Sequence, residues 1–315
     1  PTTFVAGKSY TYQLTVGKNK ISVSGINVAN WNTGTIINDG KAELYAPYVT
    51  FKAEAEQKFK MTTYGGYSIS GLQYSVNGGD WKTVVAGGEE ITFGGTNGDL
   101  RLRGTNIKGT ASGLNAYSTI TFTNDVNVTC TGDIRTLLDW RNYSTVNTQN
   151  AKFCKLFNGC SVLTSAPDLP ATTLGYYCYF KMFEGCTSLT SAPELKATAL
   201  ADYCYFSMFR GCTSLTSAPK LTATELTYYC YSNMFYNCTK LSTVTMLAPS
   251  DQISKATSCC DNWLYNAGTD KTVTSRTLKV MDADAYTALE SNLPDIWKKG
   301  TEGTKVLNKD NDEIK

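Results

Sequence analysis

The sequence contains no histidine and few charged residues. Catalytic pairs that use an imidazole as the base, and zinc sites with histidine ligands, are therefore excluded. Only 18% of the 315 residues are charged, and the 29 basic and 27 acidic side chains nearly cancel to a net charge of +2. Such a chain builds no strong field, so nucleic acid is not an expected partner. Carboxylate, tyrosine or lysine chemistry stays open, but we expect a protein that is not an enzyme.

Long apolar runs are also missing. No stretch of about 18 apolar residues occurs, so we expect no transmembrane segment. The start, Pro1-Thr2-Thr3, has neither the charged nor the apolar region of a signal peptide. This start suggests a mature or trimmed piece of a longer protein. Hydrophobic residues still make up 42% of the chain, which is enough for two or three domains with cores of their own.

A 26-residue repeat occupies the second half of the chain. Four cysteines and four phenylalanines recur at this interval: Cys160, Cys186, Cys212 and Cys238, and Phe157, Phe183, Phe209 and Phe235. A degenerate further copy contains Cys259 and Trp263 after a three-residue insertion. Periods of about 20–29 residues are typical of leucine-rich repeats. Because one copy cannot bury its apolar face alone, neighbouring copies are expected to stack into a solenoid.

Each copy is predicted to contain a helix followed by a short strand. Leu200, Tyr203, Cys204 and Met208 stand at i, i+3, i+4 and i+8, the spacing of one helix face. Gly211 follows where a left-handed C-terminal cap is wanted. The next stretch, residues 212–219, is short and β-prone and ends at a proline.

Two segments match patterns of known bacterial surface proteins. The motif Met-Phe-x-Gly-Cys-Thr-Ser-Leu-Thr-Ser-Ala-Pro at 182–193, repeated in the next copy, resembles the BspA-like leucine-rich repeats of Bacteroidales, over residues 148–265. This resemblance implies a secreted or outer-membrane-anchored protein and adhesion to host matrix proteins. Residues 10–16 and 21–31 resemble the closing hairpin of fimbrillin-like pilin domains, which implies a fimbria and partner subunits.

The predicted fold class is α+β, with a β-sandwich module followed by a leucine-rich-repeat solenoid. Strand candidates at 48–53, 72–76 and 117–122 alternate with Gly-Gly turns, as in sandwiches. A short helix is expected from Asp282 to Asn292, where it would cap the solenoid. The predicted domains are the end of a fimbrillin-like domain or a linking hairpin at 1–37, the sandwich module at 38–145, the solenoid at 146–265 and a C-terminal cap at 266–315.

The eleven cysteines leave three interpretations open. Two sets of cysteines that recur every 26 residues would form columns along the core of a stack, where they would be buried free thiols. Cysteine suits such a column because it is small and often buried. Some disulfides, or a zinc site made of thiolates alone, are the alternatives. No Cys-x-x-Cys pair is present, and no cofactor is expected. Cys130 lies outside the repeat and is predicted to be a buried strand residue.

Equivalent positions in successive copies, the columns of the repeat, also include candidate binding residues. Two tyrosine columns, Tyr177, Tyr203 and Tyr229, and Tyr179, Tyr205 and Tyr231, predict either packing between copies with the hydroxyl at the rim or a stripe that stacks on sugars. Three further columns differ between copies, so they are expected to face solvent, as a merely solvated face or as a ligand-reading surface. They are Asp168, Glu194 and Lys220; Lys181, Ser207 and Asn233; and Glu184, Arg210 and Tyr236.

Three functions follow as hypotheses. The first is adhesion by a cell-surface protein that binds a host protein and is carried on a fimbria. The second is capture of a polysaccharide by a surface glycan-binding protein. The third, a glycoside hydrolase, would need two carboxylates about 5–10 Å apart in a cleft, and no such pair stands out in the sequence.

Overall fold

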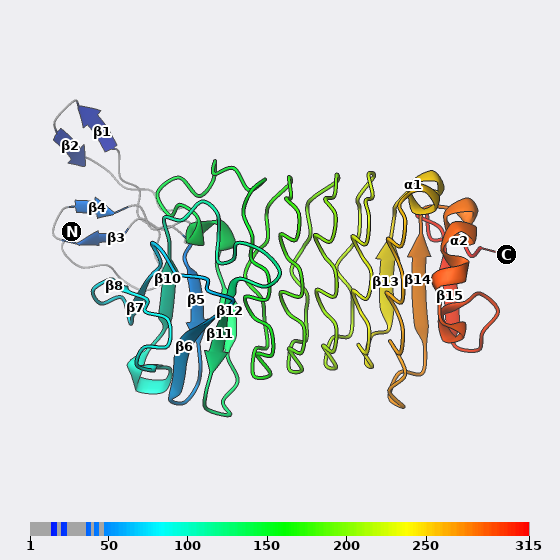
Figure 1. Cartoon of the computed structure of the whole chain (residues 1–315), viewed down its shortest axis with the longest axis horizontal. Coiled ribbons are helices and arrows are strands. Elements are labelled where there is room, and N and C mark those ends of the chain that lie inside the picture. The colour runs from blue at the N-terminus through cyan, green and yellow to red at the C-terminus, as the bar shows by residue number, and fades with distance from the viewer. Residues whose placement is uncertain (1–13, 18–19, 24–35, 39–40, 44–46, 315) are drawn as a thin grey trace. The chain divides into compact units, whose positions relative to one another are not determined.

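The computed structural model describes residues 14–17, 20–23, 36–38, 41–43 and 47–314 (Figure 1). The chain divides into two units, Pro1–Pro47 and Tyr48–Lys315. In the first unit, β1 (Leu14–Gly17) pairs antiparallel with β2 (Lys20–Val23), and β3 (Ile36–Asn38) pairs antiparallel with β4 (Lys41–Glu43). The rest of the hairpin expected between residues 10 and 31 lies outside the described residues. The domain boundaries expected after residues 37, 145 and 265 stay predictions.

Two antiparallel sheets begin the second unit. Their strand orders are β12-β5-β10-β7-β8 and β11-β6-β9. Phe51 on one sheet and Phe59 on the other are both fully buried in a shared core, where their ring centroids are 6.3 Å apart. The strands are β5 (Val49–Lys52), β6 (Gln57–Tyr64), β7 (Gln73–Val76), β8 (Lys82–Thr83), β9 (Ile91–Phe93), β10 (Leu100–Arg103), β11 (Tyr117–Phe122) and β12 (Thr129–Thr131). The three strands expected from the sequence are thus confirmed.

The 26-residue copies lie side by side between these sheets and the C-terminal elements (Figure 1). Parallel bridges join equivalent residues of neighbouring copies, such as Leu169 to Leu195 and Thr173 to Ala199. The row of bridges leads into a parallel sheet with the order β13-β14-β15. Its strands are β13 (Thr243–Met246), β14 (Arg276–Val280) and β15 (Thr304–Leu307). We call the stacked copies the repeat array.

Among the described residues, helices are short and few. The α-helices are α1 (Ser250–Lys255) and α2 (Ala283–Leu289), and the 3-10 turns are η2 (Gly95–Asn97), η3 (Ile134–Leu137), η4 (Glu290–Asn292) and η5 (Asp295–Trp297). The helix expected over residues 282–292 is confirmed as α2 with η4. Asp282 caps it, because its carboxylate accepts the N–H of Ala285 at 2.8 Å.

The prediction of an α+β fold with a β-sandwich and a leucine-rich-repeat solenoid is wrong. The described part of the chain is predominantly β, and its sheets do not close into a solenoid. The segment expected to be helical is a run of turns, because the backbone is left-handed at Tyr203 (φ +57°), Ser207 (φ +52°) and Gly211 (φ +75°). A right-handed α-helix cannot contain a left-handed residue at every fourth position.

Backbone hydrogen bonds in these turns alternate between two kinds of partner. The N–H groups of Tyr179, Lys181 and Phe183 each donate to a carbonyl oxygen of the following copy at 2.9 Å. The N–H groups between them stay within the copy, as Met182 does when it donates to the carbonyl of Tyr179 at 3.2 Å. Half of the donors therefore join copies together, whereas a helix would have used all of them internally. We call the donors that cross to the following copy the forward N–H groups.

A period of four residues explains both the turns and the misleading pattern. Leu200, Cys204, Met208 and Cys212 are four residues apart, and each is at most 7% exposed. In an α-helix of 3.6 residues per turn, that spacing would drift by about 40° at each step. Turns that repeat every four residues keep these side chains on one buried side. Beside them the phenylalanine column stacks ring on ring, with Phe157 and Phe183 5.3 Å apart.

Candidate binding surfaces

An aromatic strip runs along the outside of the repeat array. Tyr177, Tyr203 and Tyr229 take the same place in successive copies, with ring centroids 5.2 and 5.1 Å apart. Phe206 packs beside them, 5.6 Å from Tyr203. Tyr228 stands edge-on to Tyr229 at 4.2 Å and is 41% exposed. The aromatic strip comprises Tyr177, Tyr203, Phe206, Tyr228 and Tyr229, and the buried ring of Phe180 stacks against Phe206 with centroids 5.2 Å apart.

The second tyrosine column lies inside the array. Its rings also stack, 5.9 Å apart at each step, and each residue is only 1% exposed. The hydroxyl of Tyr179 is buried and has no hydrogen-bond partner among the described residues. Burial raises the pKa of this hydroxyl. The expectation of packing holds for both columns, but the expectation of a hydroxyl at the rim is wrong for Tyr179.

Polar groups edge the aromatic strip at Tyr228. The pKa of Tyr228 is raised to about 12. The largest cause is its interaction with the hydroxyl of Tyr229, and desolvation and Tyr203 contribute less. The backbone N–H of Tyr228 donates to the carboxylate of Asp202 at 3.2 Å, which fixes the backbone here. The strip thus offers apolar ring faces and hydroxyls together, a combination suited to a surface that must be stable in water and still bind a partner.

The same surface continues onto β11. Tyr117 stacks on Tyr64 with centroids 4.9 Å apart, and Tyr64 is 47% exposed. The ammonium group of Lys155 lies 4.2 Å from the ring centroid of Tyr117, within the range of a cation–π contact. Leu114 and Tyr177 pack with Tyr117 against one small apolar cluster. Aromatic side chains therefore follow one another from the sheets onto the repeat copies.

A second row of contacts joins one of the variable columns. Lys181 and Arg210 both contact the carboxylate of Glu184, at 3.1 and 3.7 Å. The guanidinium of Arg210 lies 4.7 Å from the ring centroid of Tyr236, which stacks at 4.7 Å on Tyr265 of the last copy. We call Glu184, Arg210, Tyr236 and Tyr265 the Arg-Tyr ladder. Four residues predicted from the sequence therefore lie together here, namely Lys181, Glu184, Arg210 and Tyr236, and their charges and rings are largely occupied by contacts with one another.

Ser207 does not face solvent, so that expectation is wrong. Its side chain is fully buried, and its hydroxyl has no hydrogen-bond partner among the described residues. The long stem of Lys181 carries its charge outward from the same position, whereas the short serine stays covered by its neighbours. Asn233, in the next copy, is half-buried and donates to the hydroxyl of Ser232 at 3.2 Å.

The remaining variable column is exposed and separate. Asp168, Glu194 and Lys220 are all exposed, beside the row of parallel bridges. Glu194 contacts Lys196 at 3.4 Å. Burial, and then the negative charges of Asp133 and Glu194, raise the pKa of Asp168 against the opposing effect of Lys196. No contact joins this column to the Arg-Tyr ladder within the described chain.

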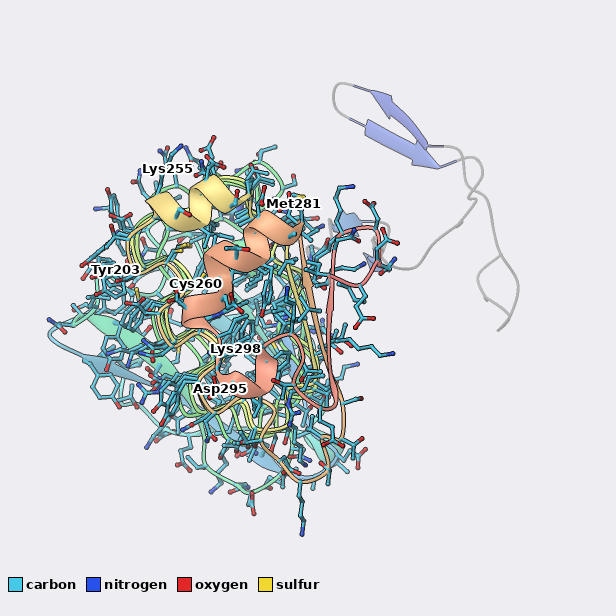
Figure 2. The ribbon with its side chains drawn as sticks, turned by 90° about the vertical axis from the view of Figure 1, so that its right-hand side faces the viewer. Tyr203, Lys255, Cys260, Met281, Asp295 and Lys298 are labelled. Carbon is cyan, nitrogen blue, oxygen red and sulfur yellow. The ribbon has the colours of Figure 1, made fainter. Side chains whose placement is uncertain are left out.

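An open cleft of about 370 Å³ lies at the C-terminal end of the repeat array. Figure 2 views the molecule from this end, with Asp295 and Lys298 labelled on the segment that follows α2. The two contact each other at 2.8 Å, and this contact lowers the pKa of Asp295. Tyr265, at the end of the Arg-Tyr ladder, is 52% exposed and lines the cleft. The other lining residues are Asp261, Asn262, Ser291, Asn292, Leu293, Pro294 and Asp295.

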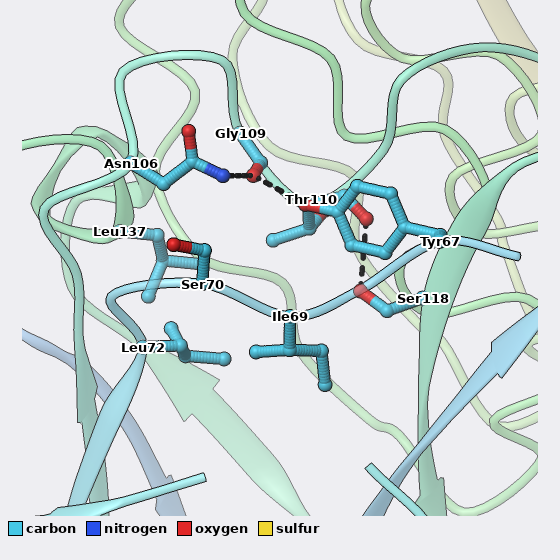
Figure 3. Close-up of a pocket in the computed structure, with 9 residues that line it drawn as sticks. All are labelled: Tyr67, Ile69, Ser70, Leu72, Asn106, Gly109, Thr110, Ser118 and Leu137. Carbon is cyan, nitrogen blue, oxygen red and sulfur yellow. Dashed lines mark hydrogen bonds between the residues drawn. The ribbon is translucent and has the colours of Figure 1, made fainter. Parts of the chain in front are cut away.

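A second, much smaller cavity lies in the β-sheet part (Figure 3). Its volume is about 10 Å³, which is room for one water molecule. Tyr67 closes it by donating to the carbonyl of Gly109 at 2.9 Å, and the hydroxyl of Ser118 donates to the carbonyl of Thr110 at 2.8 Å. The hydroxyl of Thr110 is buried without a partner in the described part of the chain. This cavity suits a structural water and is too small for a ligand.

All eleven cysteines are free and buried. Three of the repeat thiols, Cys186, Cys212 and Cys238, donate to a phenylalanine carbonyl of the preceding copy at 3.0–3.1 Å, and burial raises their pKa values. At Cys259 the pKa is lowered instead, because its sulfur interacts with that of Cys260 3.6 Å away. Among the described residues, no group of three or more histidine, cysteine or acidic side chains is placed to hold a metal ion.

Comparison of the chain with protein-family models, with curated proteins and with solved structures finds no significant match. No helix within the described residues is long and apolar enough to cross a membrane.

Sequence reasoning missed the cleft. It noted the degenerate copy at Cys259 and Trp263 but did not extend the match to Tyr265, which follows Tyr236 by 29 residues. Continuing the alignment across the three-residue insertion would have placed both tyrosines in one column. The opposite wall, residues 291–295, carries no repeat signal at all.

Proposed function

We propose that the chain is a non-enzymatic cell-surface protein that acts in adhesion and binds a host protein through the aromatic strip. The observation that carries the proposal is the continuity of exposed and half-exposed aromatic rings across successive copies. Contiguous apolar patches on a surface mark sites of interaction. Tyrosine is enriched at such sites because it offers a large rigid ring and a polar tip at low entropic cost.

The chemistry of the described side chains supports binding rather than catalysis. The sequence has no histidine, and burial raises the pKa of most thiols, which keeps them protonated. A glycoside hydrolase needs one carboxyl group whose pKa is raised so that it can act as an acid. Asp295, one of two carboxylates in the cleft, does not meet this requirement, because contact with Lys298 lowers its pKa.

The proposal extends to location and partners. We place the protein at the cell surface or outer membrane of a Bacteroidales-like bacterium, associated with fimbrial subunits. The support is the resemblance of residues 182–193 to BspA-like repeats and of residues 10–31 to fimbrillin-like hairpins.

The test is binding to immobilised fibronectin, fibrinogen, collagen and laminin by surface plasmon resonance. Tyr228→Ser should weaken a saturable interaction at least tenfold, about 1.4 kcal/mol, because it removes an exposed ring from the strip. Tyr265→Ser is the matched control, since it removes a tyrosine outside the strip that is 52% exposed, compared with 41% for Tyr228. No binding to any of the four proteins would contradict adhesion to host matrix.

A paired variant tests the competing surface. Charge reversal by Glu194→Lys with Lys220→Glu alters the exposed variable column and leaves the aromatic strip intact. If this pair abolishes binding without changing the melting temperature, and Tyr228→Ser has no effect, the partner binds the column and the aromatic strip is the wrong surface.

Capture of a glycan is the second candidate function. The observation that favours it is the open cleft beside Tyr265, where an exposed ring meets several polar side chains.

A further inference from the structure

In the last copy of the array, the forward N–H groups have no following copy to which they can donate. In the junction before it, Tyr231 and Asn233 donate to the carbonyls of Cys259 and Asp261, each at 2.9 Å. The corresponding donors of the last copy have no following copy to supply carbonyls. None of them has a hydrogen-bond partner among the described residues: they are the N–H groups of Ser258, Cys260, Asn262, Leu264 and Asn266.

The C-terminal segment covers only part of this row. Cys260 and Leu264 are fully buried, whereas Asn262 is exposed and lines the open cleft. The forward direction leads from the last copy toward the C-terminal segment, which forms the opposite wall of the cleft at residues 291–295. Backbone N–H groups are strong donors that, when buried, are almost always paired, and exposed ones bond to water or to a ligand. Asn262 therefore places at the cleft a backbone N–H without a partner among the described residues, which is open to water or to a ligand.

The other lining groups define what that ligand must carry. Asp261 and Asp295 provide carboxylate acceptors, and that of Asp295 also contacts the ammonium group of Lys298 at 2.8 Å. Asn262, Ser291 and Asn292 add amide and hydroxyl groups. Tyr265 provides a ring that is 52% exposed, although it stacks on Tyr236 at 4.7 Å.

Three ligand classes can be compared against this lining. An anion would meet the donor of Asn262 but would be repelled by Asp261, whereas the charge of Asp295 is offset by Lys298. A cation such as a guanidinium would satisfy the carboxylates but has no acceptor for the N–H group. A neutral polyhydroxylated ring meets all the groups at once, because each hydroxyl both donates and accepts, and its C–H face can stack on an exposed aromatic ring.

We propose that this cleft binds a neutral sugar ring of a carbohydrate chain. The ring stacks on Tyr265, which extends the Arg-Tyr ladder by one step. One of its hydroxyls accepts the N–H of Asn262, and others donate to Asp261 and Asp295. The volume of about 370 Å³ falls within the range of small-ligand sites, about 300–1,000 Å³. The inference rests on the second candidate function, glycan capture, and names its site and ligand class.

The experiment follows the backbone amides of the full chain by two-dimensional ¹⁵N NMR. Lactose, maltose, cellobiose and N,N′-diacetylchitobiose are titrated separately to about 20 mM, since single-site sugar affinities near millimolar correspond to only about 4 kcal/mol. At least one sugar should shift the Asn262 amide with a saturable dependence on concentration. Tyr265→Leu should weaken that sugar at least tenfold, and Tyr228→Leu should leave its affinity unchanged. Glucuronic acid and glucosamine should bind more weakly than the neutral probes.

The outcomes separate this site from the function on which it rests. Saturable shifts confined to the aromatic strip and lost in Tyr228→Leu would keep glycan capture and refute the cleft. Tighter binding of glucosamine than of any neutral sugar would overturn the neutral class. No saturable shift at Asn262 with any of the four neutral sugars, in a protein with an otherwise native spectrum, would refute the proposal.

Discussion

Alkaline pH should destabilise this protein through its cysteines. Burial is the main cause of a raised pKa for nine of the eleven thiols, among them Cys160, whose pKa rises from 9.0 to about 12. A thiol with a raised pKa holds its proton more tightly in the folded state. Its contribution to stability is therefore complete below pH 9 and is lost as the pH rises toward the folded-state pKa.

The magnitude follows from one pH unit. At pH 10, an unfolded cysteine has largely lost its proton, whereas Cys160 in the folded protein keeps it. Each such thiol then lowers the free energy of unfolding by about 1.4 kcal/mol relative to its value well below pH 9. Cys154, Cys160 and Cys230, whose pKa values all rise to about 12, together cost about 4 kcal/mol, a large part of the stability of a typical domain, about 5–15 kcal/mol. We expect the protein to be markedly less stable at pH 10 than at pH 7.

Urea unfolding followed by circular dichroism at pH 7 and pH 10, in the presence of a reductant, measures this loss. Cys160→Ala should lose about 1.4 kcal/mol less than the unaltered protein between the two pH values, because it has one titrating thiol fewer. Cys259→Ala is the control, since interaction with Cys260 lowers the pKa of Cys259 and no such saving is expected. Equal stability at both pH values, or thiolate absorbance at 240 nm that appears before unfolding, would refute the reasoning.

Three further predictions test the packing of the copies. Gly175→Ala would place its Cβ 2.0 Å from the carbonyl oxygen of Gln149, so calorimetry should show that the free energy of unfolding falls by about 1–3 kcal/mol or more. Gly113→Ala is the control and should not destabilise the protein, because Gly113 has open space around it. Equal effects of the two substitutions would contradict the close approach of the copies. The free energies of unfolding of Ser207→Gly and Ser207→Ala should agree within about 1 kcal/mol. Glycine relieves left-handed backbone strain of about 1–2 kcal/mol, and this gain offsets its larger entropy loss on folding and the loss of the alanine methyl group. If the segment were a helix, alanine would instead be more stable by about 2 kcal/mol. A thiol reagent should find few reactive cysteines in the native protein and all eleven after unfolding, and a count near zero after unfolding would mean that disulfides are present.

Much of the packing could be predicted from spacing within the chain. The interval between Phe157 and Phe183 correctly predicts that equivalent residues of neighbouring copies lie against each other. The strand at Cys130 and the helix capped by Asp282 also follow from the sequence. These features depend on local patterning and on the chemistry of single residues, which the sequence displays directly.

The backbone of the copies could not be predicted with the same rules. Leu200, Cys204 and Met208 fit a helix face well over two turns, because the difference between periods of 3.6 and 4 residues accumulates slowly. Tyr203 and Ser207 are not residues that normally adopt a left-handed backbone. They adopt it because hydrogen bonds to the following copy outweigh the local cost, and such a contribution is invisible in one copy alone.

The binding surfaces were predicted only in part. Two tyrosine columns were evident, but a ring with a hydroxyl suits both a core and a surface. The sequence therefore could not separate Tyr203, which reaches solvent, from Tyr205, which does not. The cleft requires residues 291–295 to lie opposite Tyr265, and only the tertiary fold brings these segments together.

Every junction in the array uses the same one-way set of backbone bonds, so the copies are interchangeable parts. Removing the 26 residues 183–208 would leave Met182 followed by Phe209, with donors and acceptors again in register. The aromatic strip would lose one step, and both ends of the array would stay as they are. Gene duplication or deletion in units of 26 codons could therefore adjust the reach of this surface without any new interface having to evolve.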